Sequence, residues 1–343
     1  MHHRPSLLAS NSHLSVKHIW ILLFGSFFIL TPFWATQQAQ VVSAQEPAPS
    51  FSLFLPSISR PPMRWEALLN GLPDAGGSDN LPVEANFLEL VFSPDFAKDQ
   101  TLFAGTYNYT ASNMSGSVYR SADGGETWSP TGPGMVSNPI VNLLISPDYA
   151  RDGTLFASLF YTMYYSNNRG GDWKPVAYSS GVKAAAISPN FATDGTLFST
   201  DGREIFRSTD GGKSVEPVYG RPEHIYGLSA LAVSPNFSRD QLVIAGGAQP
   251  DYQPGQFLRS TDGGASWHST NLPANKRDIQ QILFSPAFGI DQTLFVLADE
   301  CSHCVYRSTD AGATWQLTSS GLSGSHFKLA ISPDFYRDQT LFV

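Results

Sequence analysis

The stretch Ser-Pro-Asp-Phe-Ala-Lys-Asp-Gln-Thr-Leu-Phe at residues 93–103 decides the fold of this chain, because close copies of it return along the sequence. The copy at residues 332–342 reads SPDFYRDQTLF. Successive copies start 42 to 53 residues apart, and all begin with a Ser-Pro pair, at Ser93, Ser146, Ser188, Ser234, Ser285 and Ser332. A repeat of that length with strand-like contents is typical of a propeller array.

An aspartate stands six residues after each of these serines. A carboxylate at that place can accept hydrogen bonds from the backbone N–H groups of a turn. We therefore expect a structural role for all copies of this residue, which are Asp99, Asp152, Asp194, Asp240, Asp291 and Asp338.

A second motif, SADGGETW at residues 121–128, alternates with the first. Its other copies read SNNRGGDW (166–173), STDGGKSV (208–215), STDGGASW (260–267) and STDAGATW (308–315). The aspartate and glycines suit a tight hairpin turn, and the final tryptophan can bury a large ring between neighbouring sheets. The sequence thus predicts structural roles for Asp123, Asn168, Asp210, Asp262 and Asp310, and for Trp128, Trp173, Trp267 and Trp315.

Each period divides into four short strand candidates, which we name strands a to d. In the first period they are residues 88–92, 101–106, 117–121 and 127–130. Four strands per period predict an all-β propeller of four-stranded antiparallel blades, about six in number. We expect the last blade, residues 327–343, to be incomplete and closed by an N-terminal strand at residues 65–73; the alternative is a longer propeller of which this is a part. No substantial helix is expected in the repeats.

The second motif resembles the Asp-box, or bacterial neuraminidase repeat, written Ser-x-Asp-x-Gly-x-Thr-Trp, and the resemblance covers residues 64–343. Proteins with this repeat include the sialidases, the sortilin ectodomain, xyloglucan-cleaving endoglucanases and photosystem II assembly factors. The resemblance implies a six- to ten-bladed propeller but does not choose among these functions. The chain departs from the sialidases, because residues 60–62 read Arg-Pro-Pro rather than an Arg-Ile-Pro-like motif.

The N-terminal residues differ from the repeats. Basic residues precede an apolar run at residues 19–35, and small residues follow at 42–44. This pattern predicts a secretory signal at residues 1–44; the alternative is that the segment is kept as a membrane anchor. Residues 45–63 are proline-rich and are expected to form a linker, and residues 64–343 the propeller. We therefore expect a secreted or extracytoplasmic protein. No cysteine follows the apolar run, unlike in the lipoprotein form of the assembly factors.

Charge and cysteine content narrow the possible partners. The net charge is −8 and the repeats contain no block of Lys or Arg, which disfavours nucleic acid as a partner. Cys301 and Cys304 are the two cysteines, and in an exported chain they predict a small local disulfide. A zinc site would need four ligands where only His303 is adjacent, and a redox-active pair would need a helix start. We expect no metal and no cofactor.

The connections between strands predict where a site lies. Alternate turns of a meander share a face, so the uniform a–b and c–d turns share one face. The b–c and d–a connections, whose lengths vary, share the other, which suits a binding surface. Candidate binding residues there are Tyr107, Tyr109, Arg221, His224, Tyr226, Tyr252 and Arg277. One position of strand a is expected to line the central channel, where Glu89 and Lys328 are candidate contacts for a ligand or, more readily, for water.

No pair of nucleophile and base emerges from the sequence. Our leading hypothesis is therefore an exported, non-enzymatic propeller that binds a protein or a glycan through its variable connections. The alternative is a glycoside hydrolase, sialidase-like or endoglucanase-like, whose two carboxylates would come from Glu223, Asp251, Asp299 and Glu300. A third hypothesis is an assembly factor for a membrane complex. Arginines recur directly before the second motif and are predicted to pair between blades: Arg120, Arg207, Arg259 and Arg307.

Overall fold

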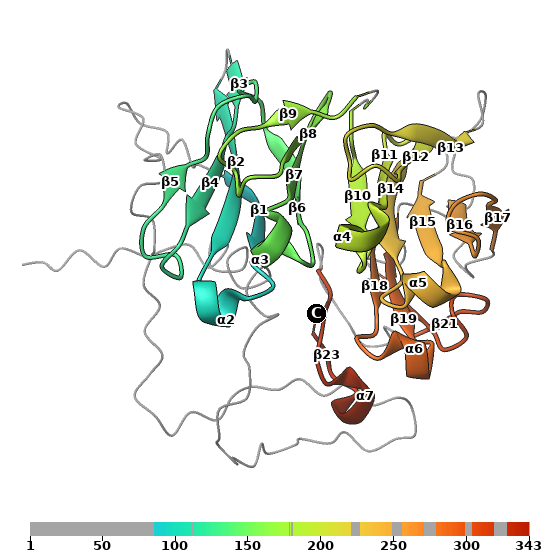
Figure 1. The fold of residues 1–343 in the computed structure, drawn as a ribbon. Coiled ribbons are helices and arrows are strands. Elements are labelled where there is room, and N and C mark those ends of the chain that lie inside the picture. The colour runs from blue at the N-terminus through green and yellow to red at the C-terminus, as the bar shows by residue number, and fades with distance from the viewer. Residues whose placement is uncertain are drawn as a thin grey trace, which may run out of the picture.

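The computed structural model describes residues 86–110, 113–177, 179, 181–220, 227–248, 256–270, 279–298, 304–318 and 328–342. These residues form antiparallel sheets that follow one another as the blades of a propeller (Figure 1). Within each full sheet the strands are paired in chain order, from a to d. The predicted all-β propeller of four-stranded blades is confirmed. The predicted signal, linker and closing strand lie outside the described residues.

The blades are numbered one to six in chain order. Blade one contains β1 (Asn86–Phe92), β2 (Leu102–Thr110), β3 (Asn113–Ser115), β4 (Val118–Ser121) and β5 (Ser129–Pro130), and β3 extends the hairpin of β2. Blade two contains β6 (Ile140–Ile145), β7 (Leu155–Leu159), β8 (Met163–Ser166) and β9 (Lys174–Pro175). Blade three contains β10 (Ala184–Ile187), β11 (Leu197–Thr200), β12 (Glu204–Ser208) and β13 (Glu216–Gly220).

The remaining blades repeat this order. Blade four contains β14 (Leu228–Val233), β15 (Val243–Gly247), β16 (Gln256–Ser260) and β17 (His268–Ser269). Blade five contains β18 (Ile279–Phe284), β19 (Leu294–Ala298), β20 (Cys304–Ser308) and β21 (Gln316–Leu317). The described part of blade six contains β22 (Ala330–Ile331) and β23 (Leu341–Phe342). Strand a is innermost, because β1 lies beside β6, β6 beside β10, β10 beside β14, and β14 beside β18.

Each a–b connection contains one helical turn that the strand pattern did not predict. The turns are α2 (Phe96–Asp99), α3 (Tyr149–Asp152), α4 (Phe191–Asp194), α5 (Phe237–Asp240), α6 (Phe288–Asp291) and α7 (Phe335–Asp338). In blade one, Ser93 Oγ donates to Asp99 Oδ2 (2.6 Å) and Thr101 N donates to Asp99 Oδ1 (2.9 Å). The aspartate thus joins the end of strand a to the start of strand b. Since every helix within the described ranges is a single turn, none has the length of a membrane span.

The two uniform turns of a blade lie on the same face, as predicted. The Asp-box turn is hydrogen-bonded to the residue that ends the helical turn, from Gly124 N to Gln100 O in blade one (3.0 Å) and from Gly263 N to Gln241 O in blade four (3.0 Å). We call this side the Asp-box face; the helical turns mark it at the lower side of Figure 1. The opposite side, which carries the b–c and d–a connections, we call the variable face.

The hydrophobic core lies between the blades rather than within one of them. The Phe103 ring of strand b in blade one contacts the Tyr149 ring of α3 in blade two, with centroids 5.8 Å apart. The same edge-to-face contact joins Phe156 to Phe191 and Phe295 to Phe335. Such pairs add to the stability that burial of the rings already gives. Each blade therefore depends on its neighbour for a closed core.

Candidate functional site

The Asp-box carboxylates are committed to the fold. Ser121 Oγ donates to Asp123 Oδ1 (2.7 Å), and both the backbone N and the hydroxyl of Thr127 donate to the Asp123 carboxylate. The Thr127 donors, followed by Ser121, lower the pKa of Asp123 to about 2. Donation from Ser266 lowers the pKa of Asp262 to about 2 in the same way. A general acid needs a raised pKa, so these groups are unsuited to acid–base catalysis at neutral pH.

Three of the tryptophans that end the Asp-boxes contact the preceding blade, namely Trp173, Trp267 and Trp315. Trp128, Trp173 and Trp315 are buried, whereas Trp267 is only partly buried. Trp173 Nε1 donates to Thr131 Oγ1 of blade one (3.0 Å), so that the ring is bonded across the boundary. Val215 stands in place of the tryptophan in blade three and is also buried.

The arginines that precede the Asp-boxes join neighbouring blades. Arg207 Nη1 donates to Gly263 O of blade four (3.0 Å), and Arg259 Nε donates to Ala311 O of blade five (2.9 Å). Arg307 Nη2 donates to Gln339 Oε1 of blade six (3.2 Å). A sialidase would need three arginines that converge on one carboxylate. In this protein Arg207, Arg259 and Arg307 lie at three different boundaries between blades, and each donates to an oxygen of the neighbouring blade.

The strand a residues that were predicted to line the central channel differ in their contacts. Burial raises the pKa of Glu89 in β1, and the positive charge of Lys328 at the start of blade six partly offsets that effect. The Gln281 carboxamide is fully engaged with the backbone of Leu329, donating to its carbonyl (3.0 Å) and accepting from its N–H (2.9 Å). Asn142 Oδ1 is buried and has no hydrogen-bond partner among the described residues. Ala184 and Ala230 occupy the same position in blades three and four.

Most of the predicted site residues lie outside the described residues. These are Glu223, Asp251, Asp299 and Glu300 of the carboxylate set, Arg221, His224, Tyr226, Tyr252 and Arg277 of the binding set, and Cys301. Tyr107 lies near the end of β2 and is paired with Asn86, while for Tyr109 the structure describes only the backbone. Cys304, at the start of β20, is held in a disulfide. The described residues contain no cluster of His, Cys, Asp or Glu that could hold a metal ion.

An exposed aromatic pair on the variable face was missed by the sequence analysis. Phe160 and Tyr161 form the b–c turn of blade two, where 39% of Phe160 and 76% of Tyr161 is exposed, and their ring centroids lie 6.4 Å apart. The turn is closed by a hydrogen bond from Leu159 N to Thr162 O (2.8 Å). We call Phe160 and Tyr161 the aromatic platform. The sequence signal that could have found it is two adjacent aromatics in one of the two shortest b–c loops, those of blades two and three.

The platform is held rigidly by the d–a connection that follows. Ser179 Oγ accepts from Met163 N (3.2 Å) and donates to Val176 O (2.9 Å). Gly181 packs so tightly on the turn that a Cβ there would lie 2.1 Å from Phe160 O. Because the backbone of the turn is held in place, less conformational freedom has to be lost there when a ligand binds, which favours binding.

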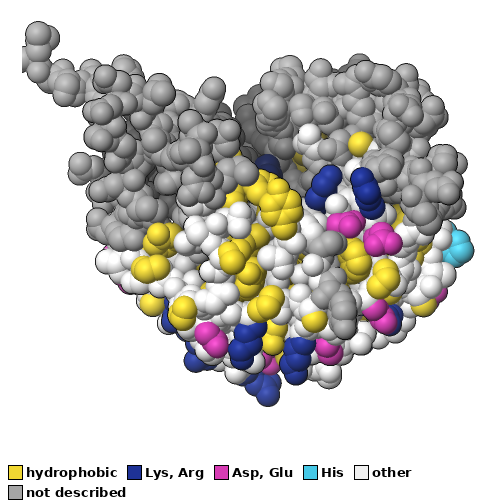
Figure 2. All heavy atoms as spheres, turned by 90° about the horizontal axis from the view of Figure 1, so that it is seen from above, with side chains coloured by type: hydrophobic (Ala, Val, Ile, Leu, Met, Phe, Trp, Pro, Cys, Tyr) yellow, Lys and Arg dark blue, Asp and Glu magenta, His cyan; other side chains and the backbone are white. Residues whose placement is uncertain are grey.

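Charged side chains of both signs lie on the same face in blade three. Lys183 lies over Gly202, and Asp201 Oδ1 accepts from the backbone N–H groups of Arg203 (2.8 Å) and Glu204 (2.9 Å). In Figure 2, which views this face, hydrophobic side chains form a band across the described surface and basic and acidic side chains lie side by side next to it. In blade three the two positive charges, on Lys183 and Arg203, balance the two negative charges, on Asp201 and Glu204.

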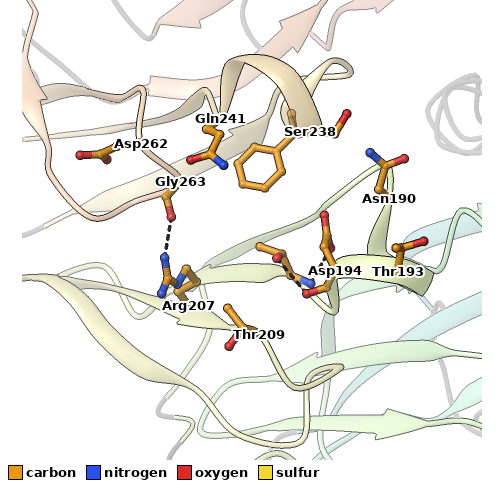
Figure 3. A pocket seen from close by; sticks show the side chains of 11 residues that line it. Asn190, Thr193, Asp194, Arg207, Thr209, Ser238, Gln241, Asp262 and Gly263 are labelled. Atoms are coloured by element: carbon orange, nitrogen blue, oxygen red, sulfur yellow. Dashed lines mark hydrogen bonds between the residues drawn. The ribbon is translucent and has the colours of Figure 1, made fainter.

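Two clefts open on the other side of the molecule, at boundaries between blades. One, of about 490 Å³, lies between blades three and four, next to α4, α5 and the Asp-box of blade four (Figure 3). The second, of about 460 Å³, lies between blades one and two beside Arg120 and Arg169. Neither cleft was predicted from the sequence, because the variable connections were expected to carry the binding residues.

Two family models match the chain. The model described as Sortilin, neurotensin receptor 3 (Sortilin-Vps10) matches residues 203–342, and the model of the BNR/Asp-box repeat matches residues 119–130. Both support the Asp-box resemblance that the repeated motif carries.

Similar proteins of known function include carbohydrate-active enzymes. The chain is 30% identical over 104 residues to the xyloglucanase Xgh74A of Acetivibrio thermocellus, a match that covers 28% of this chain and 12% of that enzyme. The GH74 xyloglucanase of Xanthomonas campestris is similar in structure, with a TM-score of 0.56 and 20% identity over 77% of this chain and 44% of the enzyme. YCF48 bound to D1 peptide has a TM-score of 0.50 and 13% identity, over 74% of this chain and 90% of that protein. At these identities the two structures show the fold alone.

Proposed function

Because the chain is an Asp-box β-propeller protein, we propose that it binds a neutral polysaccharide through its variable face. The aromatic platform is the observation that carries this proposal. Phe160 and Tyr161 form a contiguous exposed apolar surface, and such surfaces mark sites of interaction more often than single exposed side chains do. The C–H face of a pyranose ring is apolar and lies flat on such a ring, while the sugar hydroxyls stay in water.

Charge supports a neutral ligand rather than an acidic one. The side chains beside the platform in blade three balance in sign, and the whole chain carries a net charge of −8. A polyanion would therefore be repelled at long range and would gain no net attraction at the face itself. The hydroxyl groups of a neutral sugar can accept from Lys183 and Arg203 and donate to Glu204.

The similarity to the xyloglucanase favours a glycan over a protein partner. That relative is named for its action on xyloglucan, and it matches this chain in sequence. A second xyloglucanase, that of Xanthomonas campestris, is similar in fold. We further propose that the protein acts outside the cytoplasm, where polysaccharides occur. The predicted signal and the disulfide at Cys304 support this location.

The test is the affinity of the purified protein for soluble xyloglucan and mixed-linkage β-glucan, with Tyr161→Ala as the variant. Loss of an aromatic anchor costs about 2 kcal/mol or more in binding, so the dissociation constant should rise about thirtyfold or more. Tyr336→Ala is the matched control, because Tyr336 is also exposed (53%) but belongs to α7 on the Asp-box face. Equal weakening by both variants, or no binding of neutral polysaccharide, would rule the proposal out.

A glycoside hydrolase is the second candidate, favoured by the same sequence match. It requires two carboxylates across the bound sugar, and the four candidates lie outside the described residues. Release of reducing ends from xyloglucan separates the two functions. If Glu223→Gln, Asp251→Asn, Asp299→Asn or Glu300→Gln abolishes that release without loss of affinity, the protein is an enzyme.

A further inference from the structure

The boundary between blades three and four differs from the equivalent boundary between blades five and six. At the latter, Arg307 donates to Gln339 Oε1, and Gln339 Nε2 donates to Phe335 O (2.9 Å). The residues that correspond to these two are Arg207, the last but one residue of its strand c, and Gln241, which follows the helical turn α5. Arg207 is bonded to Gly263 O and Glu216 instead, and Gln241 makes no side-chain hydrogen bond within the described residues. A cleft of about 490 Å³ lies at this boundary, lined by Arg207 and Gln241 among others, and we call it the seam cleft.

Both walls of the seam cleft carry uncommitted hydrogen-bonding groups. Blade three supplies Asn190 and Thr193 beside α4 and Thr209 from its Asp-box, and blade four supplies Ser238 and Gln241 (Figure 3). All five are exposed, and none of their side chains is hydrogen-bonded to another described residue. Amides and hydroxyls both donate and accept, as sugar hydroxyls do. The volume lies in the about 300–1,000 Å³ range of small-molecule sites.

The charges around the cleft exclude an anionic ligand. Asp194 and Asp262 line it together with the single cation Arg207, which also faces Glu216 (3.4 Å). The pKa of Asp262, at about 2, keeps that carboxylate ionised at neutral pH. The two fixed negative charges would repel an incoming anion. They do not repel a neutral hydroxylated molecule. The Phe237 ring, largely buried, supplies the one apolar surface.

We propose that the seam cleft is a second ligand site, on the Asp-box face, and that it binds a short neutral oligosaccharide. Gln241 and Ser238 bind it from one side, and Asn190, Thr193 and Thr209 from the other. The site is independent of the aromatic platform, because the two lie on opposite faces of the molecule. A protein with one site on each face can bind two segments of polysaccharide at once.

The test uses saturation-transfer NMR and calorimetry with cellotriose, maltotriose and mannotriose. We expect at least one trisaccharide to bind the wild-type protein. Ser238→Trp fills the cleft and should weaken that binding at least about tenfold, and Gln241→Ala should weaken it about three- to tenfold. Tyr336 occupies the position of Ser238 in α7, so a large ring is compatible with this helical turn.

The control variant is Ala97→Trp, which places the same side chain at the same position of α2. It should leave trisaccharide binding unchanged, as should Tyr161→Ala on the variable face. Failure of all three sugars to bind, or equal loss in Ser238→Trp and Ala97→Trp, overturns the seam site and leaves the platform proposal untouched. Binding of a neutral Ser-Thr-rich peptide in place of the sugars would overturn the ligand class.

Discussion

Asn168 shows what the Asp-box requires of its third residue. In blade two this asparagine accepts from Ser166 Oγ (2.8 Å) and from Asp172 N (3.0 Å) through a single oxygen, Oδ1. Asp262 makes the equivalent two bonds in blade four and adds a third, from Ser266 Oγ to Oδ2 (2.5 Å). All five described Asp-boxes therefore use an acceptor oxygen at this position. Four of the five also carry a negative charge there.

From this we predict that Asp262→Ala lowers the free energy of unfolding by about 1–2 kcal/mol, because it removes all three bonds. Asp262→Asn should cost less than half as much, since Asn168 shows that an amide keeps two of them. Urea unfolding at pH 7 measures both values. A loss as large in Asp262→Asn as in Asp262→Ala would mean that charge, and not the acceptor oxygen, holds the turn.

The lowered pKa gives the same residue a defined pH dependence. A carboxyl whose pKa falls to about 2 on folding contributes stability that is present above its unfolded pKa, about 3.9, and is lost as the pH falls toward 2. Stability should therefore decline between about pH 4 and pH 2, and Asp262→Asn should decline less in that window. The side chain is exposed, so the difference will be a fraction of a kcal/mol. Identical acid profiles of the two proteins would contradict the assignment.

Individual residues also show which features could be predicted from the sequence and which could not. The structural aspartates were predictable, because each recurs in register and a turn needs an acceptor there. Phe160 and Tyr161 were not predictable in this way, since binding surfaces are expected in long loops. The short b–c loop of blade two exposes its rings because it has no room to fold them back. The seam cleft was not predictable either, because no sequence rule tells that Gln241 lines a cleft while the equivalent Gln339 bonds to Arg307.

In the Asp-box hairpin of blade three, two adjacent glycines allow the effect of backbone strain to be distinguished from the effect of packing. Gly211 and Gly212 have the same φ, +79°, which disfavours any other residue. A Cβ on Gly211 would meet nothing within 4 Å, whereas on Gly212 it would lie 2.1 Å from the Phe156 ring of blade two. The hairpin of blade three therefore packs directly on the core of the blade before it.

We predict that Gly211→Ala lowers the free energy of unfolding by about 1 kcal/mol, through backbone strain alone. Gly212→Ala should cost about 1–3 kcal/mol more, because the added methyl overpacks the boundary between the blades. Equilibrium unfolding of the two variants checks this difference. Equal losses would indicate that the hairpin does not press on Phe156.

The strands themselves were largely predictable, because Ser-Pro and the Asp-box mark their ends. Strand a of blade one begins two residues earlier than expected, at Asn86, and strand d is only two residues long in four blades. The helical turns were missed, since four residues are too few to show a helical period. They form because Ser93 and Asp99 bond to each other across the turn, a contact between side chains that periodicity does not report.

The molecule as a whole brings its first and sixth blades together at the channel. Glu89 and Lys328 come from opposite ends of the repeat array, yet the ammonium of Lys328 acts on the Glu89 carboxyl. The pKa of Glu89 is raised by burial, so its contribution to stability is full below its unfolded pKa, about 4.3, and is lost as the pH rises through the raised value. Once the carboxyl is ionised in the folded protein, its buried charge is thus a cost that Lys328 reduces.

This arrangement predicts that mutations of Glu89 and Lys328 have coupled effects on stability, because the ring brings the two residues close together. At pH 7, Glu89→Gln should raise the free energy of unfolding, and Lys328→Met should lower it by about 0.5–1 kcal/mol, a small value because Lys328 is exposed. In the Glu89→Gln background, Lys328→Met should have no further effect, and below pH 4 neither change should matter. Lys98→Met, on the Asp-box face, removes an equal charge far from Glu89 and should not couple to it. Additive effects of Glu89→Gln and Lys328→Met would show that the sixth blade does not face the first across the channel.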